Sequence, residues 1–343
     1  DFSHAEEVLT TALQLAEKLK STVTVEANRL VGLILYYFAV LAWAKYDFVL
    51  ALQLAERALD VFERLEEEIM KATVSQFIAT LYIRRGEAEK AKEFYQRAVN
   101  SQRRAGAVYY LLTSLQGLGL LSLDEGEWHQ AEQYFKEALK IAEQVGNLSD
   151  QVTLYTMLGG VYDVKGLWFL AHDFYGRART IIEQDDGKID CRTRFALLGN
   201  IALLRAKQGE LEAAEEYIAQ AAKTIEGLDD SYLQFNLLVN QAEVALRAER
   251  LERARGFLVR AFWIVAREPD WRKLAKLYIL SSRLRLAAGD CYRAHYAANR
   301  ALTLLRDYPS SLEFAIGLRC SGLAKCRLDQ MEKVGRASCR ERV

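Results

Sequence analysis

The stretch LYTMLGGVYDVKGLWFLAHDFYGRARTII (residues 154–182) decides the fold of this chain. Within it, Leu158, Gly159 and Tyr162 recur at the spacing of one face of a helix. Gly166 then interrupts the pattern, and glycine is the residue with which helices most commonly end. The stretch therefore begins with a helix that ends near residue 166.

A second helix follows, because Ala171, Tyr175 and Ala178 again recur three and four residues apart. Gly159 and Ala171 have almost no side chain, so the two helix backbones can approach closely where these residues meet. We expect Tyr162 and Tyr175 to fill the wider ends of the gap. The stretch predicts a helical hairpin with a seam of small residues.

The same plan returns along the chain at a period of 40 residues, with one step of 43. The predicted turns between helices are Tyr46, Gly86, Gly126, Gly166, Gly209, Glu249, Gly289 and Asp329. The small residues of the first helices are Ala39, Ala79, Gly119, Gly159, Ala202, Ala242, Ser282 and Gly322. The second helices carry two alanine columns, Ala51, Ala91, Ala131, Ala171, Ala214, Ala254 and Ala294, then Ala58, Ala98, Ala138, Ala178, Ala221, Ala261 and Ala301. This period predicts an all-α fold, a single superhelical α-solenoid of stacked antiparallel helix hairpins over residues 3–333.

These columns, and the link ALKIAEQVGN from Ala138 to Asn147, resemble tetratricopeptide repeats (TPR). The 40-residue form is similar to the repeats of kinesin light chains and of bacterial signalling regulators of the maltose-activator type. The resemblance implies a TPR-like array that binds peptides, partner proteins or small effectors along a groove lined by the first helices. In those regulators an ATPase module precedes the array and a DNA-binding module often accompanies it, and neither module is present in these residues.

The two ends of the chain depart from the repeat. At the amino end, Ala5 and Ala12 carry second-helix columns without a first helix, and residues 335–343 (GRASCRERV) leave the pattern and resemble translated vector sequence. We therefore expect an array truncated at both ends, followed by a non-native tail. Apolar faces left open at Ala5–Leu19 and Leu312–Leu328 should favour self-association.

Composition argues for a soluble helical protein and against a membrane or secreted one. The chain is 51% hydrophobic and 27% charged and has only 2 Pro, as suits a long soluble helical array. Its densest apolar run, Leu30–Ala44, carries the spacing of the repeat, so we expect no membrane segment, no signal peptide and a cytoplasmic location.

The residues that usually carry chemistry are scattered. The 5 Cys and 4 His show neither the paired spacing of a zinc site nor a second ligand one helical turn away. A glycine-rich phosphate loop needs a preceding strand, and the pattern predicts none. We expect no enzymatic activity, no catalytic residue, no metal and no cofactor.

Charge is uneven although the totals balance at 46 basic and 46 acidic residues. Residues 250–343 hold 20 Lys and Arg against 9 Asp and Glu, and residues 250–334 still hold 17 against 8. This basic end, interleaved with Trp263, Trp271, Tyr278, Tyr292 and Tyr296, could suit a nucleic acid, or the acidic surface of a partner or second copy. Nucleic acid is the less favoured interpretation, because helical arrays bind protein segments more often.

The ligand groove is predicted from hairpin geometry, because the exposed side of each first helix, offset from the small-residue column, should line the concave side of the array. These candidate binding residues are Tyr36, Trp43, Thr73, Gln76, Thr80, Arg84, Thr113, Gln116, Thr156, Asp163, Asn236, Glu243, Arg247, Lys276, Arg283 and Arg319. The set changes from aromatic through neutral polar to basic. It would complement an extended segment with an apolar anchor at one end and acidic residues at the other.

Two functions from different classes follow. The favoured one is a protein-interaction scaffold that binds a peptide or partner protein in the concave groove. The alternative is the effector-sensing TPR arm of a larger ATP-dependent bacterial transcriptional regulator, in which a small molecule in the groove shifts an equilibrium between resting and active states.

Overall fold

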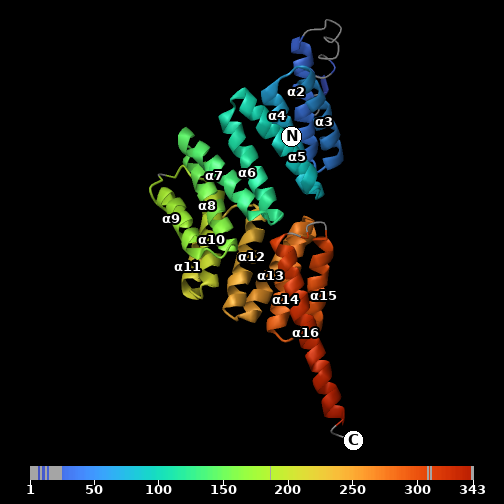
Figure 1. Cartoon of the computed structure of the whole chain (residues 1–343), viewed down its shortest axis with the longest axis vertical. Coiled ribbons are helices and arrows are strands. Elements are labelled where there is room, and N and C mark those ends of the chain that lie inside the picture. The colour runs from blue at the N-terminus through green and yellow to red at the C-terminus, as the bar shows by residue number, and fades with distance from the viewer. Residues whose placement is uncertain are drawn as a thin grey trace. The chain divides into compact units, whose positions relative to one another are not determined.

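The computed structural model describes residues 7, 10, 11, 14, 25–185, 187–306, 309 and 311–340, with side chains up to residue 330. All regular structure in these residues is α-helical (Figure 1). The helices are α2 (Val25–Ala44), α3 (Phe48–Arg64), α4 (Glu68–Arg85), α5 (Ala88–Ala105), α6 (Val108–Asp124), α7 (Trp128–Val145), α8 (Leu148–Val164), α9 (Trp168–Glu183), α10 (Cys191–Lys207), α11 (Leu211–Thr224), α12 (Ser231–Arg247), α13 (Leu251–Arg267), α14 (Trp271–Ala287), α15 (Cys291–Leu304) and α16 (Leu312–Arg340). The predicted second-helix residues Ala5 and Ala12 lie outside the described residues.

The helices group into two compact units. The first unit holds the chain up to residue 121 together with residues 133–145, and within it α2 packs on α3 and α4 packs on α5. The second unit holds residues 122–132 and 146–343, with the hairpins α8–α9, α10–α11, α12–α13 and α14–α15. The all-α fold of stacked hairpins is therefore confirmed, and the boundaries 3–333 of a single domain stay a prediction.

Seven of the eight predicted turns are confirmed by their backbone. The glycines at these turns have φ between 73° and 85°, and Tyr46 and Glu249 adopt 64° and 56°. At Gly166 the next residue, Leu167, donates its N–H to the carbonyl of Tyr162 at 2.8 Å, which satisfies a carbonyl that the helix end would leave open. Glycine recurs at this position because it has no Cβ to oppose a left-handed backbone.

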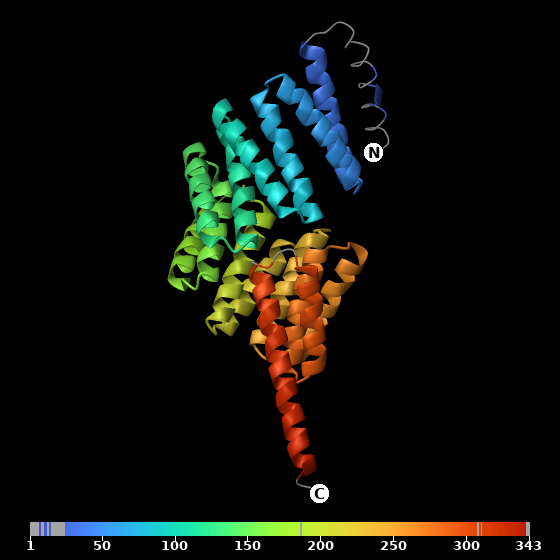
Figure 2. The ribbon, with the colours of Figure 1, turned by 45° about the vertical axis from the view of Figure 1, so that its right-hand side comes forward.

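The eighth turn, predicted at Asp329, is wrong. Helix α16 runs unbroken through this residue to Arg340, and both views show it extending past α14 and α15 (Figures 1 and 2). Residues 330–333 (QMEK), which directly follow Asp329, are good helix formers, and none of them favours a left-handed backbone. The predicted column residue Gly322 is exposed, whereas Cys320 and Ala324 are buried against the preceding hairpin.

The alanine columns are confirmed at every position. All fourteen alanines have a relative exposure of 0%. A helix can approach its neighbours this closely only where the side chain ends at Cβ, because protein interiors are packed to crystal-like density. The two columns therefore set the distance between helices throughout the described hairpins.

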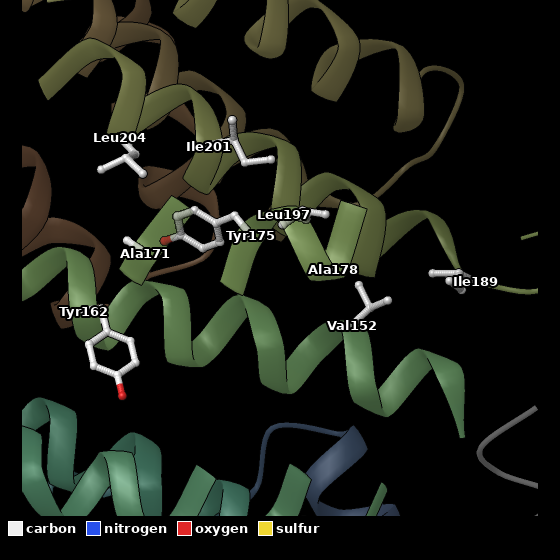
Figure 3. Close-up of a cluster of buried hydrophobic side chains, with 9 residues drawn as sticks. All are labelled: Val152, Tyr162, Ala171, Tyr175, Ala178, Ile189, Leu197, Ile201 and Leu204. Atoms are coloured by element: carbon white, nitrogen blue, oxygen red, sulfur yellow. The ribbon is translucent and has the colours of Figure 1, made fainter. Parts of the chain in front are cut away.

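Glycine in a first helix makes room for an aromatic ring of the second. A Cβ on Gly159 would lie 2.3 Å from Cε1 of Tyr175, and one on Gly119 would lie 2.3 Å from Cε1 of Phe135. The expectation that Tyr175 fills a wider end of the gap is therefore wrong, because its ring lies directly on the backbone of α8. Figure 3 shows this ring in a buried cluster with side chains of α8, α9 and α10.

One described helix, α2, is long and apolar enough to cross a membrane, by length and composition alone. A core helix of a soluble protein meets the same criterion. Helix α2 buries Val31, Leu35 and Ala39, and Gly32 receives the ring of Phe62 from α3, as in the other hairpins. The absence of a membrane segment stays a prediction.

The packing of the Tyr175 ring on the backbone of α8 can be tested by substituting two glycines of one hairpin. We expect Gly159→Ala to destabilise the fold by about 1–3 kcal/mol, because the added methyl overlaps the ring. Gly176 of α9 has no atom within 4 Å of an added Cβ. The matched Gly176→Ala should therefore stabilise by about 0.5–1 kcal/mol. Urea unfolding would measure both, and a stabilising effect of Gly159→Ala would contradict this packing.

Candidate ligand-binding face

The second unit has a hollow of about 180 Å³ beside the first turns of α12 and α14. Its walls combine four large apolar or aromatic side chains with three cations, two carboxylates and two neutral polar groups. The lining residues are Tyr232, Phe235, Trp271, Leu305, Arg272, Lys273, Lys276, Asp124, Glu313, Asn236 and Ser311. The hollow is therefore mainly apolar with charged groups at hand, the composition expected of a ligand site.

Capping aspartates place the side chains of the hollow. Asp230 accepts a hydrogen bond from the N–H of Leu233, which begins α12. Asp270 accepts from the N–H groups of Arg272 and Lys273, which begins α14. A capped first turn has a fixed register. The aromatic and cationic groups of the hollow are therefore held by rigid helix ends and not by loops.

Two cations of the hollow lie over aromatic rings. The Nζ of Lys273 is 5.7 Å from the ring centroid of Tyr232 and 5.5 Å from that of Phe235. The Cζ of Arg272 is 5.1 Å from the ring of Trp271. Such contacts hold a cation against an apolar wall. The hollow thus offers flat apolar surface edged by positive charge.

A carboxylate from another hairpin joins the hollow. The Oδ2 of Asp124, at the end of α6 in residues assigned to the second unit, is 3.4 Å from Nη1 of Arg272. The pKa of Asp124 is raised to about 6, mainly by burial, while Arg272 lowers it and Glu313 and Glu125 raise it. This carboxyl therefore changes charge close to neutral pH.

An ion cluster lies two helical turns further along the same side of α12 and α14. The carboxylate of Glu243 accepts from Nε of Arg247 at 3.0 Å and from Nη1 of Arg283. Burial opposes the ionisation of Glu243, but the two guanidinium groups outweigh it and lower its pKa. We call Tyr232, Asn236, Glu243 and Arg247 of α12, with Arg272, Lys276 and Arg283 of α14, the first-helix face.

The structure brings some predicted groove residues of the second unit together. Asn236 and Lys276 share the hollow, and Glu243, Arg247 and Arg283 share the ion cluster. Elsewhere in this unit, Asp163 binds Lys207 at 2.6 Å, Thr156 is buried and donates to the carbonyl of Val152, and Arg319 is exposed on α16.

The predicted residues of the first unit make contacts between neighbouring first helices. Tyr36 and Trp43 of α2 both meet the ring of Phe77 on α4 edge to face, with centroids 5.7 and 6.3 Å apart. Gln76 accepts from the hydroxyl of Ser114 on α6 at 3.3 Å. Of the others, Thr73 and Thr80 donate to backbone carbonyls, Gln116 is half-buried, and Arg84 and Thr113 are exposed.

Sequence reasoning missed most of the hollow. Trp271 directly follows the capping Asp270, whereas Tyr232 lies two residues after the capping Asp230, so the two rings occupy neighbouring first-turn positions and not one column of the period. Leu305 follows α15, Glu313 lies in the first turn of α16 and Asp124 ends α6, so only the packed structure shows that they line the same space as α12 and α14. Among the described residues, no group of three or more His, Cys, Asp or Glu is placed to hold a metal ion.

The comparisons with known proteins concern the fold. A tetratricopeptide repeat model matches residues 72–104, most of the hairpin α4–α5. The sequence gives no significant match to a curated protein.

Three solved structures illustrate the likeness. BtubC from P. vanneervenii superposes with a TM-score of 0.57 at 20% identity, over 67% of this chain and 94% of that chain. The apo form of RapI superposes with a TM-score of 0.65 at 15% identity, over 80% and 98%. The Rap conjugation gene regulator of plasmid pLS20, in complex with the Phr* peptide, gives 0.59 at 16% identity, over 82% and 78%. At these identities the likeness shows the fold alone.

The charge of Asp124 predicts how stability depends on pH. Its pKa in the fold, about 6, exceeds the ordinary value of about 4, so the neutral form suits the fold better. The stability that this group contributes is complete below pH ~4 and is lost as the pH rises through about 6.

Asp124→Asn mimics the neutral form, so at pH 7.5 it should be at least as stable as the parent. At pH 4 the two proteins should be alike. Urea unfolding at both values measures the difference, and a variant that is clearly weaker at pH 7.5 would contradict the assignment.

Proposed function

We propose that this chain, a tetratricopeptide-repeat protein, binds an extended peptide or a segment of a partner protein on the first-helix face of its second unit. One apolar side chain of the ligand occupies the hollow beside Trp271. The observation that carries the proposal is the hollow itself, where aromatic walls and cations lie on capped, rigid helix ends. Buried aromatic anchors of this kind supply most of the binding energy in protein interfaces.

The charge of the face favours an acidic residue beside the apolar anchor. Lys276 lines the hollow and is exposed, so its ammonium group is accessible to a ligand carboxylate. Arg272 and Lys273 are already engaged with Asp124 and with aromatic rings. Lys276 is therefore the cation that we assign to the ligand.

The ion cluster revises the basic end predicted from the sequence. Arg247 and Arg283 are both bound by Glu243, so the three residues together carry one positive charge. Reversing either arginine would leave a buried carboxylate poorly paired and would damage the fold as well as the binding. Lys276 and the exposed Arg319 are better placed to be varied.

Proteins of similar fold support a peptide ligand. One Rap regulator is in complex with the Phr* peptide, and another Rap protein is complexed with Competence and Sporulation Factor. The likeness reaches only the fold, so the choice of peptide rests on the hollow of this chain.

The test is a selection from a random 12-residue peptide display library against the full chain. We expect the enriched peptides to place an aromatic or aliphatic residue next to Asp or Glu. Trp271→Ala should weaken the best of them by about 30-fold or more, as loss of a buried anchor does. Lys276→Glu should slow association and weaken its dependence on salt.

Matched controls lie on outer surfaces of the same unit. Phe169 of α9 is 85% exposed and Lys223 of α11 is exposed, so Phe169→Ala and Lys223→Glu should bind as the parent does. Circular dichroism would confirm that all four variants are folded. Peptides that bind Trp271→Ala and Lys276→Glu as tightly as the parent would exclude this face as the site.

A further inference from the structure

The second helices α13 and α15 carry a strong positive charge. Together they hold six arginines and one glutamate, whereas the preceding second helix, α11, holds three glutamates and one lysine. Both α13 and α15 pack on α14, so this charge belongs to one region of the second unit. The net charge changes from negative on α11 to positive on α13. The positive charge is therefore a local feature of this region, since the chain as a whole has equal numbers of basic and acidic residues.

The arginines of α13 form a line. Arg253, Arg260 and Arg267 are seven residues apart, which places them on one side of the helix, and all three are exposed. Within the part of the chain that the structure describes, none of the three has a carboxylate at ion-pair distance. These guanidinium groups are therefore available to a bound anion.

The same two helices, α13 and α15, carry three aromatic rings that are open to solvent. Trp263 is 68% exposed, Tyr292 is 76% exposed and Tyr296 is 62% exposed. On α15 the two tyrosines share one side of the helix with the exposed polar residues Asn299 and Thr303. These rings do not serve the fold, because most of their surface contacts no other residue.

We propose that this outer face, made of Arg253, Arg260, Trp263, Arg267, Tyr292 and Tyr296, binds single-stranded nucleic acid. The guanidinium groups hold the phosphates, since their planar forks match phosphate oxygens, and the exposed rings stack on unpaired bases. This inference does not rest on the proposed peptide site, which lies on other residues.

Two other anionic partners fit the face less well. An anionic membrane would need a continuous apolar stripe, but here arginines and the polar residues Asn299 and Thr303 share these helix sides with the rings. An acidic protein segment would use the cations and leave the flat aromatic surface without a role. Single-stranded nucleic acid uses both features at once.

The experiment measures fluorescence anisotropy of a fluorescein-labelled 20-residue oligo(dT) titrated with the full chain at several salt concentrations. If the three arginines of the face contact phosphates, the slope of log K against log salt should be about −2. The double variant Arg253→Glu and Arg260→Glu removes two of these three contacts, so it should remove about two thirds of that slope and most of the affinity. Trp263→Ala and Tyr292→Ala should each weaken binding about tenfold through lost stacking.

Controls separate this face from general attraction between charges. Arg177→Glu with Arg179→Glu makes the same charge change on the second helix α9, and Phe169→Ala removes an exposed ring there. Both controls should bind oligo(dT) within about twofold of the parent.

Three outcomes would overturn the proposal. One is no binding at 50 mM salt. Another is binding that the control variants weaken as much as the face variants do. The third is equal or tighter binding to a 20-bp duplex, to polyglutamate or to phosphatidylserine vesicles, since these offer negative charge without unpaired bases.

Discussion

The close crossing of helices at the alanine columns is the constraint on which the rest of the structure depends. Two positions in each second helix have no exposed surface, and a side chain larger than a methyl group has no room there. The space saved in this way admits the aromatic rings that lie on the first-helix glycines, as Tyr175 does on Gly159. The inner side of each second helix is therefore buried against neighbouring helices. The side chains that can contact a ligand are those of the first-helix face and the outer face.

These two faces carry different chemistry on the same scaffold. On the first-helix face the cations are largely matched, Arg272 by Asp124 and Arg283 by Glu243, and the hollow is mainly apolar. On the outer face, Arg253, Arg260 and Arg267 of α13 are exposed, and the exposed rings are Trp263 of α13 and Tyr292 and Tyr296 of α15. Matched charge around a hollow suits a ligand recognised by shape, whereas uncompensated charge on an open surface suits a polyanion.

Sequence reasoning succeeded where the cause is local and repeated. Glycine at the turns is required by a left-handed backbone angle, and alanine in the columns is required by the short distance between helices. Both requirements recur with the period of the repeat. It failed at Asp329, because the period alone placed a turn there and no local residue supports one. It also failed for the hollow, since Asp124, Leu305 and Glu313 lie far apart in sequence and only packing brings them together. The pairing of Glu243 with Arg283 was likewise missed, because it joins two hairpins, whereas Arg247 lies one helical turn from Glu243 on the same helix.

The most direct test of the central constraint compares two alanines two residues apart in α11. Ala221 has no exposed surface and packs in a cluster with Phe195 and Leu233, whereas Ala219 is exposed. Unfolding in urea should show that Ala221→Leu loses about 1–3 kcal/mol through overpacking, while Ala219→Leu stays within about 0.5 kcal/mol of the parent. Equal stability of the two variants would contradict the claim that the alanine columns set the spacing of the helices.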